Sequence, residues 1–329
     1  MINMDKKDKQ ILEILCKNAR TSHNKISKIV KLTKNAVTYR IERLQKQGII
    51  TGFATIASHR RLGYSFYELL LKTKVNREKE KELIEFLQKH ENVLVIDRFI
   101  GEWNFVIEFG LNRIQKLFII LDEIKDKFYD IIELYEIHPI YEAYKVEQLP
   151  IDLIKEPKYF TPFKKHYEYY NIDKTIDNTD KKLLYLLNKN TTAPLYMLAK
   201  ELNITAETVT KRIKKLKEKE EILKFTAIIN LEKLGYNLYL IQMKLRNLSK
   251  QKEEEIRKYL IKHLNVRYSF LSATSQTIFT YFAVENSNEL DRFLRETREK
   301  FADIVVEQKY HLWCEQYKYN MFPKGLLEE

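Results

Sequence analysis

The side chains with the clearest binding chemistry lie on one face of the segment 33–48. If this segment is a helix, Asn35 and Tyr39 lie on its outermost line, because residues four apart are neighbours on a helix. Asn, Arg and Lys can hydrogen bond with base edges in the major groove, whereas Thr, Tyr and Lys can bind phosphates. The segment is therefore predicted to bind double-stranded DNA. The predicted contact residues are Lys34, Asn35, Thr38, Tyr39, Arg40 and Arg43.

The opposite face of this segment explains what would hold it in place. Val37, Ile41 and Leu44 recur at helical spacing and form one apolar seam. Thr33 can cap the start of the helix, and Gly48 can end it in a left-handed conformation. The segment is therefore predicted to be an amphipathic helix that buries one side and presents the other.

Two shorter helices are predicted before this segment. Asp5 can cap the first, and either Ser22 or Asn24 can cap the second. Three helices with a short turn before the third describe a helix-turn-helix, abbreviated HTH below. Residues 49–56 alternate weakly around a Gly, as expected of a strand or small wing.

The whole pattern occurs twice. Residues 5–67 align with residues 177–239 at an offset of 172, with roughly 20 identities. The repeat resumes where residues 141–150 match 314–323, at an offset of 173. In the second copy Glu207 replaces Asn35, so weaker or differently specific DNA binding is expected there. The predicted contact residues of the second copy are Thr210, Lys211, Arg212, Lys214 and Lys215.

Charge is unevenly distributed along the chain. The net charge is +12 in total, yet residues 1–61 alone carry 14 Lys/Arg against 4 Asp/Glu. Residues 62–150 carry 12 against 17, and residues 177–233 carry 12 against 8. Positive charge thus gathers where the predicted HTH segments lie, as expected of modules that bind a polyanion.

After each HTH the hydrophobic pattern changes to alternating strands and amphipathic helices in the order βαββαβ. This order is typical of the ferredoxin-like fold. The first copy has predicted elements at 67–75, 77–90, 93–100, 103–109, 113–128 and 131–146. The second has them at 238–245, 252–264, 267–272, 278–284, 289–301 and 304–317.

These motifs resemble the Lrp/AsnC, or feast/famine, family of transcription regulators. The resemblance rests on Asp8-Lys-Gln-Ile-Leu, on Thr33-x-x-x-Val37-x-x-Arg40-Ile41-x-x-Leu44 with Gly48, and on Leu62-Gly63. It implies an α+β chain of two repeats, each a winged HTH followed by a ferredoxin-like βαββαβ domain. The predicted domains are HTH 1 at 1–61, ferredoxin-like domain 1 at 62–150, a linker at 151–176, HTH 2 at 177–233 and ferredoxin-like domain 2 at 234–329.

The resemblance also implies partners. Family members dimerise through the ferredoxin-like domains, so the two halves are expected to form a fused pseudo-dimer that can form homo-oligomers. They bind DNA and often an amino-acid-like effector near a Gly-x-x-Asp motif. The first copy has Gly101, Glu102, Trp103 and Asn104 at that place, with Asn instead of Asp, whereas residues 274–277 keep neither motif residue. We therefore expect at most an altered effector site in the first copy and none in the second.

An enzyme of the same architecture is the alternative. Sirohaem decarboxylases of haem biosynthesis share this two-part unit, and they resemble the first copy at Glu102-Trp-Asn104. They typically carry a His-Asn-Tyr stretch in the preceding strand, which here reads Val95-Ile-Asp-Arg-Phe99. None of the seven histidines is expected to recur at equivalent positions. No catalytic residue, metal site or cofactor is predicted, and we expect a regulator and not an enzyme.

Composition excludes several other classes. The longest apolar runs are too short to span a bilayer, and the first residues lack an apolar targeting region. Cys16 and Cys314 have no metal-like spacing and are expected to be reduced thiols. The protein is therefore expected to be cytoplasmic and associated with the nucleoid. The aromatic and basic residues of 159–170 could stack on bases, but packing onto a domain is the preferred interpretation.

Overall fold

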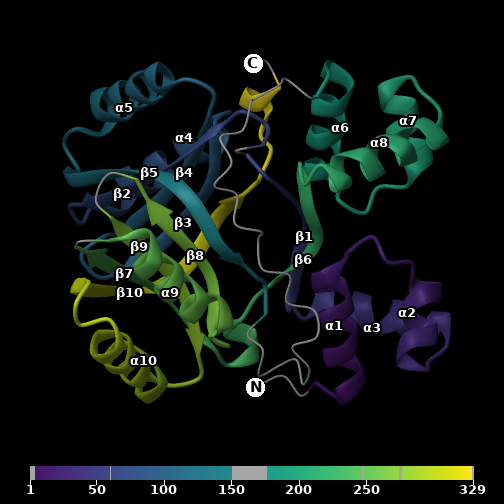
Figure 1. Cartoon of the computed structure of the whole chain (residues 1–329). Helices are drawn as coiled ribbons and strands as arrows, with labels where there is room; N and C mark the ends of the chain where they lie inside the picture. Colours follow the sequence, from purple (N-terminus) through teal and green to yellow (C-terminus); the bar gives the residue numbers. More distant parts are fainter. Residues whose placement is uncertain (1–3, 60, 150–175, 247, 274–275, 328–329) are drawn as a thin grey trace. The chain divides into compact units, whose positions relative to one another are not determined.

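The computed structural model describes residues 4–59, 61–149, 176–246, 248–273 and 276–327 (Figure 1). Both repeats have the predicted order of elements, which confirms the α+β class. The first repeat comprises α1 (Lys6–Lys17), α2 (His23–Val30), α3 (Lys34–Lys46), β1 (Ile50–Ala57), β2 (Ser65–Thr73), α4 (Arg77–Lys89), β3 (Val93–Ile100), β4 (Phe105–Leu111), α5 (Ile114–Phe128) and β5 (Ile132–Val146). The second comprises α6 (Asn178–Lys189), α7 (Leu195–Leu202), α8 (Ala206–Glu218), β6 (Ile222–Ile229), β7 (Asn237–Leu245), α9 (Lys250–Lys262), β8 (Val266–Ser272), β9 (Thr277–Val284), α10 (Ser287–Lys300) and β10 (Val305–Tyr319).

The described chain divides into two compact units, and neither of them is one repeat. The first unit contains residues 4–54, 141–149 and 225–312, so it joins the first HTH to most of the second βαββαβ region. The second unit contains residues 55–140, 176–224 and 313–327, apart from residue 60, and joins the second HTH to the first βαββαβ region. The domain boundaries drawn from the sequence follow single repeats and stay a prediction.

The sheet of the second unit has the strand order expected of a ferredoxin-like domain. Strand β2 lies between β4 and β5, and β3 lies beyond β4. The end of β10 adds a fifth strand beside β3, where Asn320 N donates to Leu94 O at 2.8 Å. Apolar residues of α4 and α5, such as Leu83 and Ile120, pack on one face of this sheet together with Phe109.

The first unit repeats this arrangement. Strand β7 lies between β9 and the start of β10, and β8 lies beyond β9. The end of β5 supplies the fifth strand beside β8, where Glu147 N donates to Arg267 O at 2.8 Å. Apolar residues of α9 and α10, such as Leu260 and Phe293, form the core with Phe282.

The last strand of each repeat therefore completes the sheet of the other repeat. Tyr144, at the end of β5, is fully buried among residues of the second repeat. Its neighbour Lys145 donates from Nζ to the carbonyl of His263 at 2.7 Å. The equivalent Lys318, 173 positions later, donates from Nζ to the carbonyl of His90 at 2.8 Å. Burial lowers the pKa of each of these two lysines to about 8.

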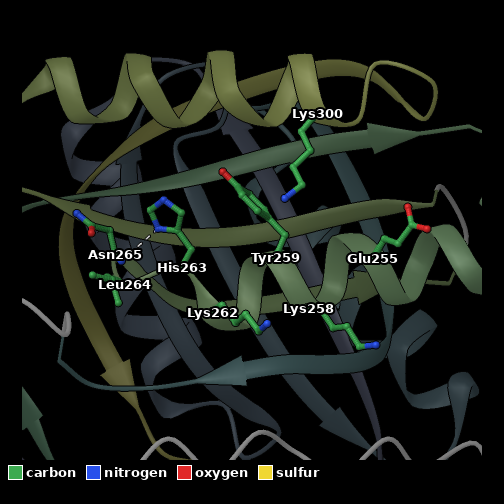
Figure 2. Close-up of a pocket in the computed structure, with 8 residues that line it drawn as sticks. All are labelled: Glu255, Lys258, Tyr259, Lys262, His263, Leu264, Asn265 and Lys300. Carbon is green, nitrogen blue, oxygen red and sulfur yellow. Dashed lines mark hydrogen bonds between the residues drawn. The ribbon is translucent and has the colours of Figure 1, made fainter. Parts of the chain in front are cut away.

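These contacts correct the expectation that no histidine recurs. His90 and His263 are the C-caps of α4 and α9, and in each the ring Nδ1 accepts from the backbone N–H two residues later (Figure 2). His138 and His311 are likewise 173 positions apart and buried. The offset changes from 172 to 173 before α4 and α9, since their N-caps Asn76 and Ser249 already differ by 173.

The predicted wing is a strand that pairs across the repeats. In the first unit Asn230 N donates to Ile49 O at 2.9 Å, and β1 pairs with β6 in a two-stranded sheet. The core of the first HTH accordingly includes Ala227, Ile229 and Leu231 from the second repeat. The core of the first HTH is therefore built from residues of both repeats.

Three buried carboxylic acids lie in the sheet formed by β2, β3 and β4 of the second unit. Glu68 and Glu108 are directly opposite each other in β2 and β4, and Asp97 is close enough to affect Glu108. Burial, followed by the charges of Glu68 and Asp97, raises the pKa of Glu108 well above its usual value. Asp97 Oδ1 accepts from Trp313 Nε1 at 3.1 Å and from Gln316 Nε2 at 3.0 Å.

Candidate nucleic-acid interface

The three helices of the first HTH begin after capping residues that the sequence predicts. Asp5 caps α1, Ser22 caps α2, and Thr33 caps α3 by accepting from Ala36 N at 3.2 Å. The turn between α2 and α3 passes through Lys31 in the left-handed region, at φ 54°. Gly48 follows α3 at φ 71°, a conformation that glycine adopts without steric cost.

The outward face of α3 carries the predicted reading groups. Val37, Ile41 and Leu44 are buried, whereas Lys34 and Asn35 are exposed. Tyr39 is 64% exposed, so its ring is available to a partner. Thr38 is less accessible, because its hydroxyl donates to Lys34 O and lies 2.7 Å from His23 Nδ1.

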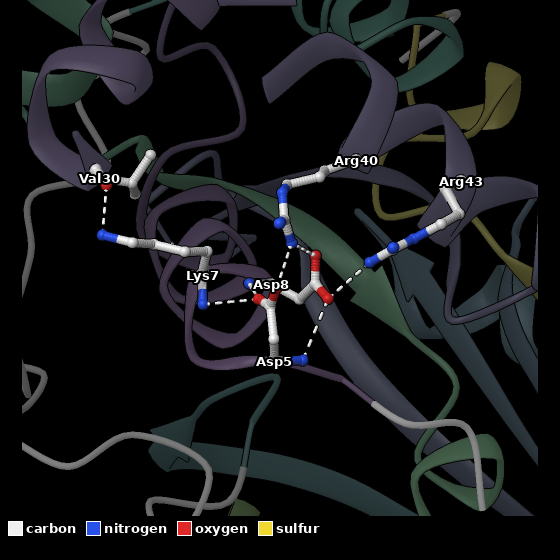
Figure 3. A network of polar contacts seen from close by, with 6 residues as sticks. All are labelled: Asp5, Lys7, Asp8, Val30, Arg40 and Arg43. Atoms are coloured by element: carbon white, nitrogen blue, oxygen red, sulfur yellow. Dashed lines mark hydrogen bonds and ion pairs between the residues drawn. The ribbon is translucent and has the colours of Figure 1, made fainter. Parts of the chain in front are cut away.

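Two of the predicted contact residues have partners inside the HTH (Figure 3). Arg40 Nη1 donates to Asp5 Oδ2 and Asp8 Oδ1, both at 2.7 Å, and Arg43 Nη2 donates to Asp8 Oδ2 at 2.5 Å. Asp8 is 1% exposed, so both arginines are drawn toward α1. The hydrogen bonds that Arg40 donates to Asp8 and Asp5 raise the pKa of Arg40. This network fixes α3 on α1, and DNA contact by Arg40 and Arg43 stays a prediction.

The second HTH contains the same anchor. Arg212 Nη1 donates to Asp177 Oδ2 at 2.8 Å and to Asp180 Oδ1 at 2.7 Å. Sequence reasoning assigned only Asp5 to a helix cap and did not predict the ion pairs of either HTH. The available signal was the equal spacing of Asp8 to Arg40 and Asp180 to Arg212 in the two copies.

The outward face of α8 is partly neutralised by its own acids. Lys211 Nζ lies 2.7 Å from Glu207 Oε1, and Lys214 Nζ lies 3.8 Å from Glu218 Oε1. Glu207 and Glu218 occupy the places of Asn35 and Lys46. Thr210 and Lys215 are exposed. Acids of α8 itself thus compensate part of the positive charge of this face, whereas α3 has Asn35 and Lys46 at the two matching positions.

The helix before the reading helix also differs between copies. Asn24 and Lys25, at the start of α2, correspond to Tyr196 and Met197 at the start of α7. Tyr196 is 69% exposed and Met197 is 48% exposed. An amide and a cation that could bind phosphate are thus replaced by an aromatic and an apolar side chain.

The residues predicted to bind an effector have mostly structural contacts. Trp103 is 3% exposed. Asn104 Oδ1 accepts from Thr73 N at 2.8 Å and from Thr73 Oγ1 at 3.3 Å. Gly101 and Glu102 are exposed at the turn between β3 and β4. The matching stretch 274–277 lies partly outside the described residues. The aromatic residues of the linker, at 159–170, lie wholly outside them.

Among the residues of the described ranges, no group of three or more His, Cys, Asp or Glu could hold a metal ion. Within those ranges, no helix has the length and apolar character needed to cross a bilayer.

Two family models match the chain at the two HTH segments. Residues 4–51 match a winged helix-turn-helix DNA-binding model, and residues 176–217 match an AsnC-type helix-turn-helix domain. Both matches coincide with the three-helix segments described above.

Similar proteins extend the match beyond the HTH. The HTH-type transcriptional regulator FL11 of Pyrococcus abyssi is 31% identical over 123 residues, which cover 37% of this chain and 81% of that protein. LrpA of the same organism is 39% identical over 92 residues, covering 27% of this chain and 63% of LrpA. The crystal structure of the siroheme decarboxylase NirDL matches 97% of this chain and 94% of its own, with a TM-score of 0.61 and 15% identity, which shows a shared fold alone. The chain belongs to the Lrp/AsnC family of HTH-type transcriptional regulators, with two HTH segments in one polypeptide.

Proposed function

We propose that this regulator binds an asymmetric DNA site as a fused pseudo-dimer, with α3 as the main reading helix. The observation that carries the proposal is the contrast between the two outward faces. Asn35 and Tyr39 are exposed on α3, whereas on α8 Glu207 takes the place of Asn35 and pairs with Lys211. An Asn side chain can bond adenine bidentately, but a carboxylate accepts only and is repelled by phosphate.

Pairing of strands from both repeats supports the pseudo-dimer. Each compact unit draws strands from both copies, so the single chain contains the exchange that two separate protomers would make. We assign Arg40, Arg43 and Arg212 to positioning the reading helices, because their guanidinium groups bond acids of α1 and α6. The remaining predicted residues are assigned to bases and phosphates.

The test begins with selection of bound duplexes from a random pool. We expect one enriched, asymmetric motif whose affinity falls steeply with salt. Asn35→Ala should cost about 1–3 kcal/mol and relax one base position, whereas Lys34→Ala should weaken all sequences and lower the salt slope by about 1. Lys211→Ala should have a smaller effect on the salt slope, because Glu207 already compensates that charge.

The matched exchange separates the two helices. Asn35→Glu should abolish the enriched motif, and Glu207→Asn should add selected bases at the second half-site. Equal losses for Asn35→Ala and Thr210→Ala would show two equivalent readers and would contradict the asymmetry. Binding without an enriched motif would indicate an architectural, nucleoid-type role.

Three finer assignments belong to the same proposal. An amino-acid-like effector would bind near Gly101 and Glu102, and calorimetry with the twenty amino acids tests this. Homo-oligomers would form through the ferredoxin-like domains, and light scattering tests that. If the chain does not bind DNA even at low salt, the enzyme alternative gains weight, since the fold resembles NirDL along nearly the whole chain. Absorbance titration with an iron tetrapyrrole would then test the enzyme alternative.

A further inference from the structure

A pocket of about 460 Å³ lies at the end of α9 in the second repeat (Figure 2). Its volume falls in the range of small-molecule sites. The lining combines basic side chains with one aromatic ring and an amide. The lining residues are Glu255, Lys258, Tyr259, Lys262, His263, Leu264, Asn265 and Lys300.

Three ammonium groups face this pocket against one carboxylate. Lys300 Nζ lies 4.8 Å from the centre of the Tyr259 ring, and Lys258 Nζ lies 3.5 Å from Glu254 Oε1. In the part of the chain that the structure describes, neither Lys262 nor Lys300 forms an ion pair. The charges of these two lysines are therefore available to a bound anion.

The helix end is not an obstacle to a bound anion. The last carbonyls of a helix carry partial negative charge, which disfavours a nearby anion. Here Lys145 Nζ donates to the carbonyl of His263, the C-cap of α9. A buried cation thus offsets the dipole directly beneath the pocket. Burial and the charge of Lys145 lower the pKa of His263 to about 4, so the imidazole is neutral near pH 7.

The equivalent surface of the first repeat provides an internal comparison. Lys89 and Lys127 correspond to Lys262 and Lys300, but Glu85 and Glu91 stand in place of Lys258 and Leu264. Two lysines and two glutamates thus balance at this place in the first repeat, where Lys324 Nζ also lies 2.8 Å from Glu91 Oε1. In the second repeat neither of these glutamates is present, so positive charge predominates.

We propose that the α9 pocket binds a small anion with two or more negative charges, carried by carboxylate or phosphate groups. Lys258, Lys262 and Lys300 would bind the charges, and Tyr259 and Asn265 would line its polar edge. No residue of this site belongs to α3, to α8 or to the turn at Gly101. It gives the second repeat a binding surface that the first repeat lacks.

Calorimetric titration of the full chain with pyrophosphate and with citrate, without DNA, tests the proposal. At least one probe should bind saturably, and added salt should weaken it. Lys262→Gln together with Lys300→Gln should raise the dissociation constant at least tenfold, about 1.4 kcal/mol. Lys258→Glu with Leu264→Glu, the residues of the first repeat, should abolish binding. Preference for pyrophosphate identifies a phosphate ligand, and preference for citrate a carboxylate one.

The matched control is Lys89→Gln with Lys127→Gln, which removes the same charge from the first repeat and should leave binding unchanged. The proposal is overturned if neither probe binds saturably, if the Lys262/Lys300 variant retains full affinity, or if the control pair loses affinity equally. Circular dichroism melts confirm that each variant folds. The titration contains no DNA, so its outcome is independent of the proposed reading helices.

Discussion

Substitution of Lys145 by Met tests the strand exchange between the repeats. Lys145 is 2% exposed, and burial lowers its pKa from 10.5 to about 8. That difference corresponds to about 3 kcal/mol, which the folded chain loses by burying the ammonium group at neutral pH. The hydrogen bond to the His263 carbonyl returns part of this free energy.

The sign of the pH dependence follows from the lowered pKa. Above about pH 8 the folded chain binds fewer protons at this site than the unfolded chain, so the free energy of unfolding rises until about pH 10.5. Between pH 7 and pH 9.5 the unsubstituted chain should therefore gain about 2 kcal/mol relative to Lys145→Met. Below pH 7 the difference between the two chains should stay constant.

Guanidinium chloride unfolding at several pH values, followed by circular dichroism, measures this difference. Lys89→Met is the control, because Lys89 is exposed on α4, and its difference from the unsubstituted chain should not change between pH 7 and 9.5. Equal denaturant slopes are required for the comparison. If the free energies of unfolding of Lys145→Met and of the unsubstituted chain change in parallel with pH, Lys145 is not a buried ammonium group with a lowered pKa, and the reasoning is refuted.

Three further changes have expected outcomes. Glu108→Gln should raise the free energy of unfolding at pH 7 and have little effect at pH 4, because a carboxyl group with a raised pKa contributes stability that is lost as pH rises; thermal melts at both pH values check this. Asp8→Asn should destabilise the first HTH by about 2 kcal/mol and weaken DNA binding. Asp180→Asn should destabilise the second HTH by a similar amount with less effect on DNA binding, and amide hydrogen exchange shows which HTH has lost stability. Glu220→Gly should be about 1 kcal/mol more stable than Glu220→Ala, because position 220 has φ 56° and both variants lose the Arg61 ion pair; denaturant midpoints compare the two.

Local signals explain why the HTH could be predicted closely. Thr33 and Gly48 lie at the two ends of α3, so their effect on the helix is local. The apolar residues Val37, Ile41 and Leu44 recur at helical spacing. The βαββαβ order could also be predicted, because apolar residues alternate along strands and recur every three to four residues along helices. Element boundaries shifted where a contact from elsewhere decides them: β4 begins at Phe105, since Asn104 bonds β2.

Features that depend on distant parts of the chain were not predicted. Arg40 was expected to face DNA, because nothing in its own helix shows that Asp8, 32 positions earlier, lies within hydrogen-bond distance. The pairing of Lys145 with His263 joins the end of one repeat to a helix of the other, 118 positions away. Periodicity cannot reveal such pairs, although their recurrence in both copies could have done so once the offset of 173 was applied.

The two repeats agree in their interior and differ on their surfaces. The Asp8–Arg40 and Lys145–His263 contacts recur as Asp180–Arg212 and Lys318–His90. In contrast, the exposed Asn35 of α3 is replaced by Glu207 on α8. In a dimer of identical chains, any substitution would change both reading faces together. Fusion removes that restriction, because each face can change while the shared anchors keep both helices in place. The asymmetric DNA site that we propose rests on this divergence, since two unlike helices cannot both match the halves of a palindrome.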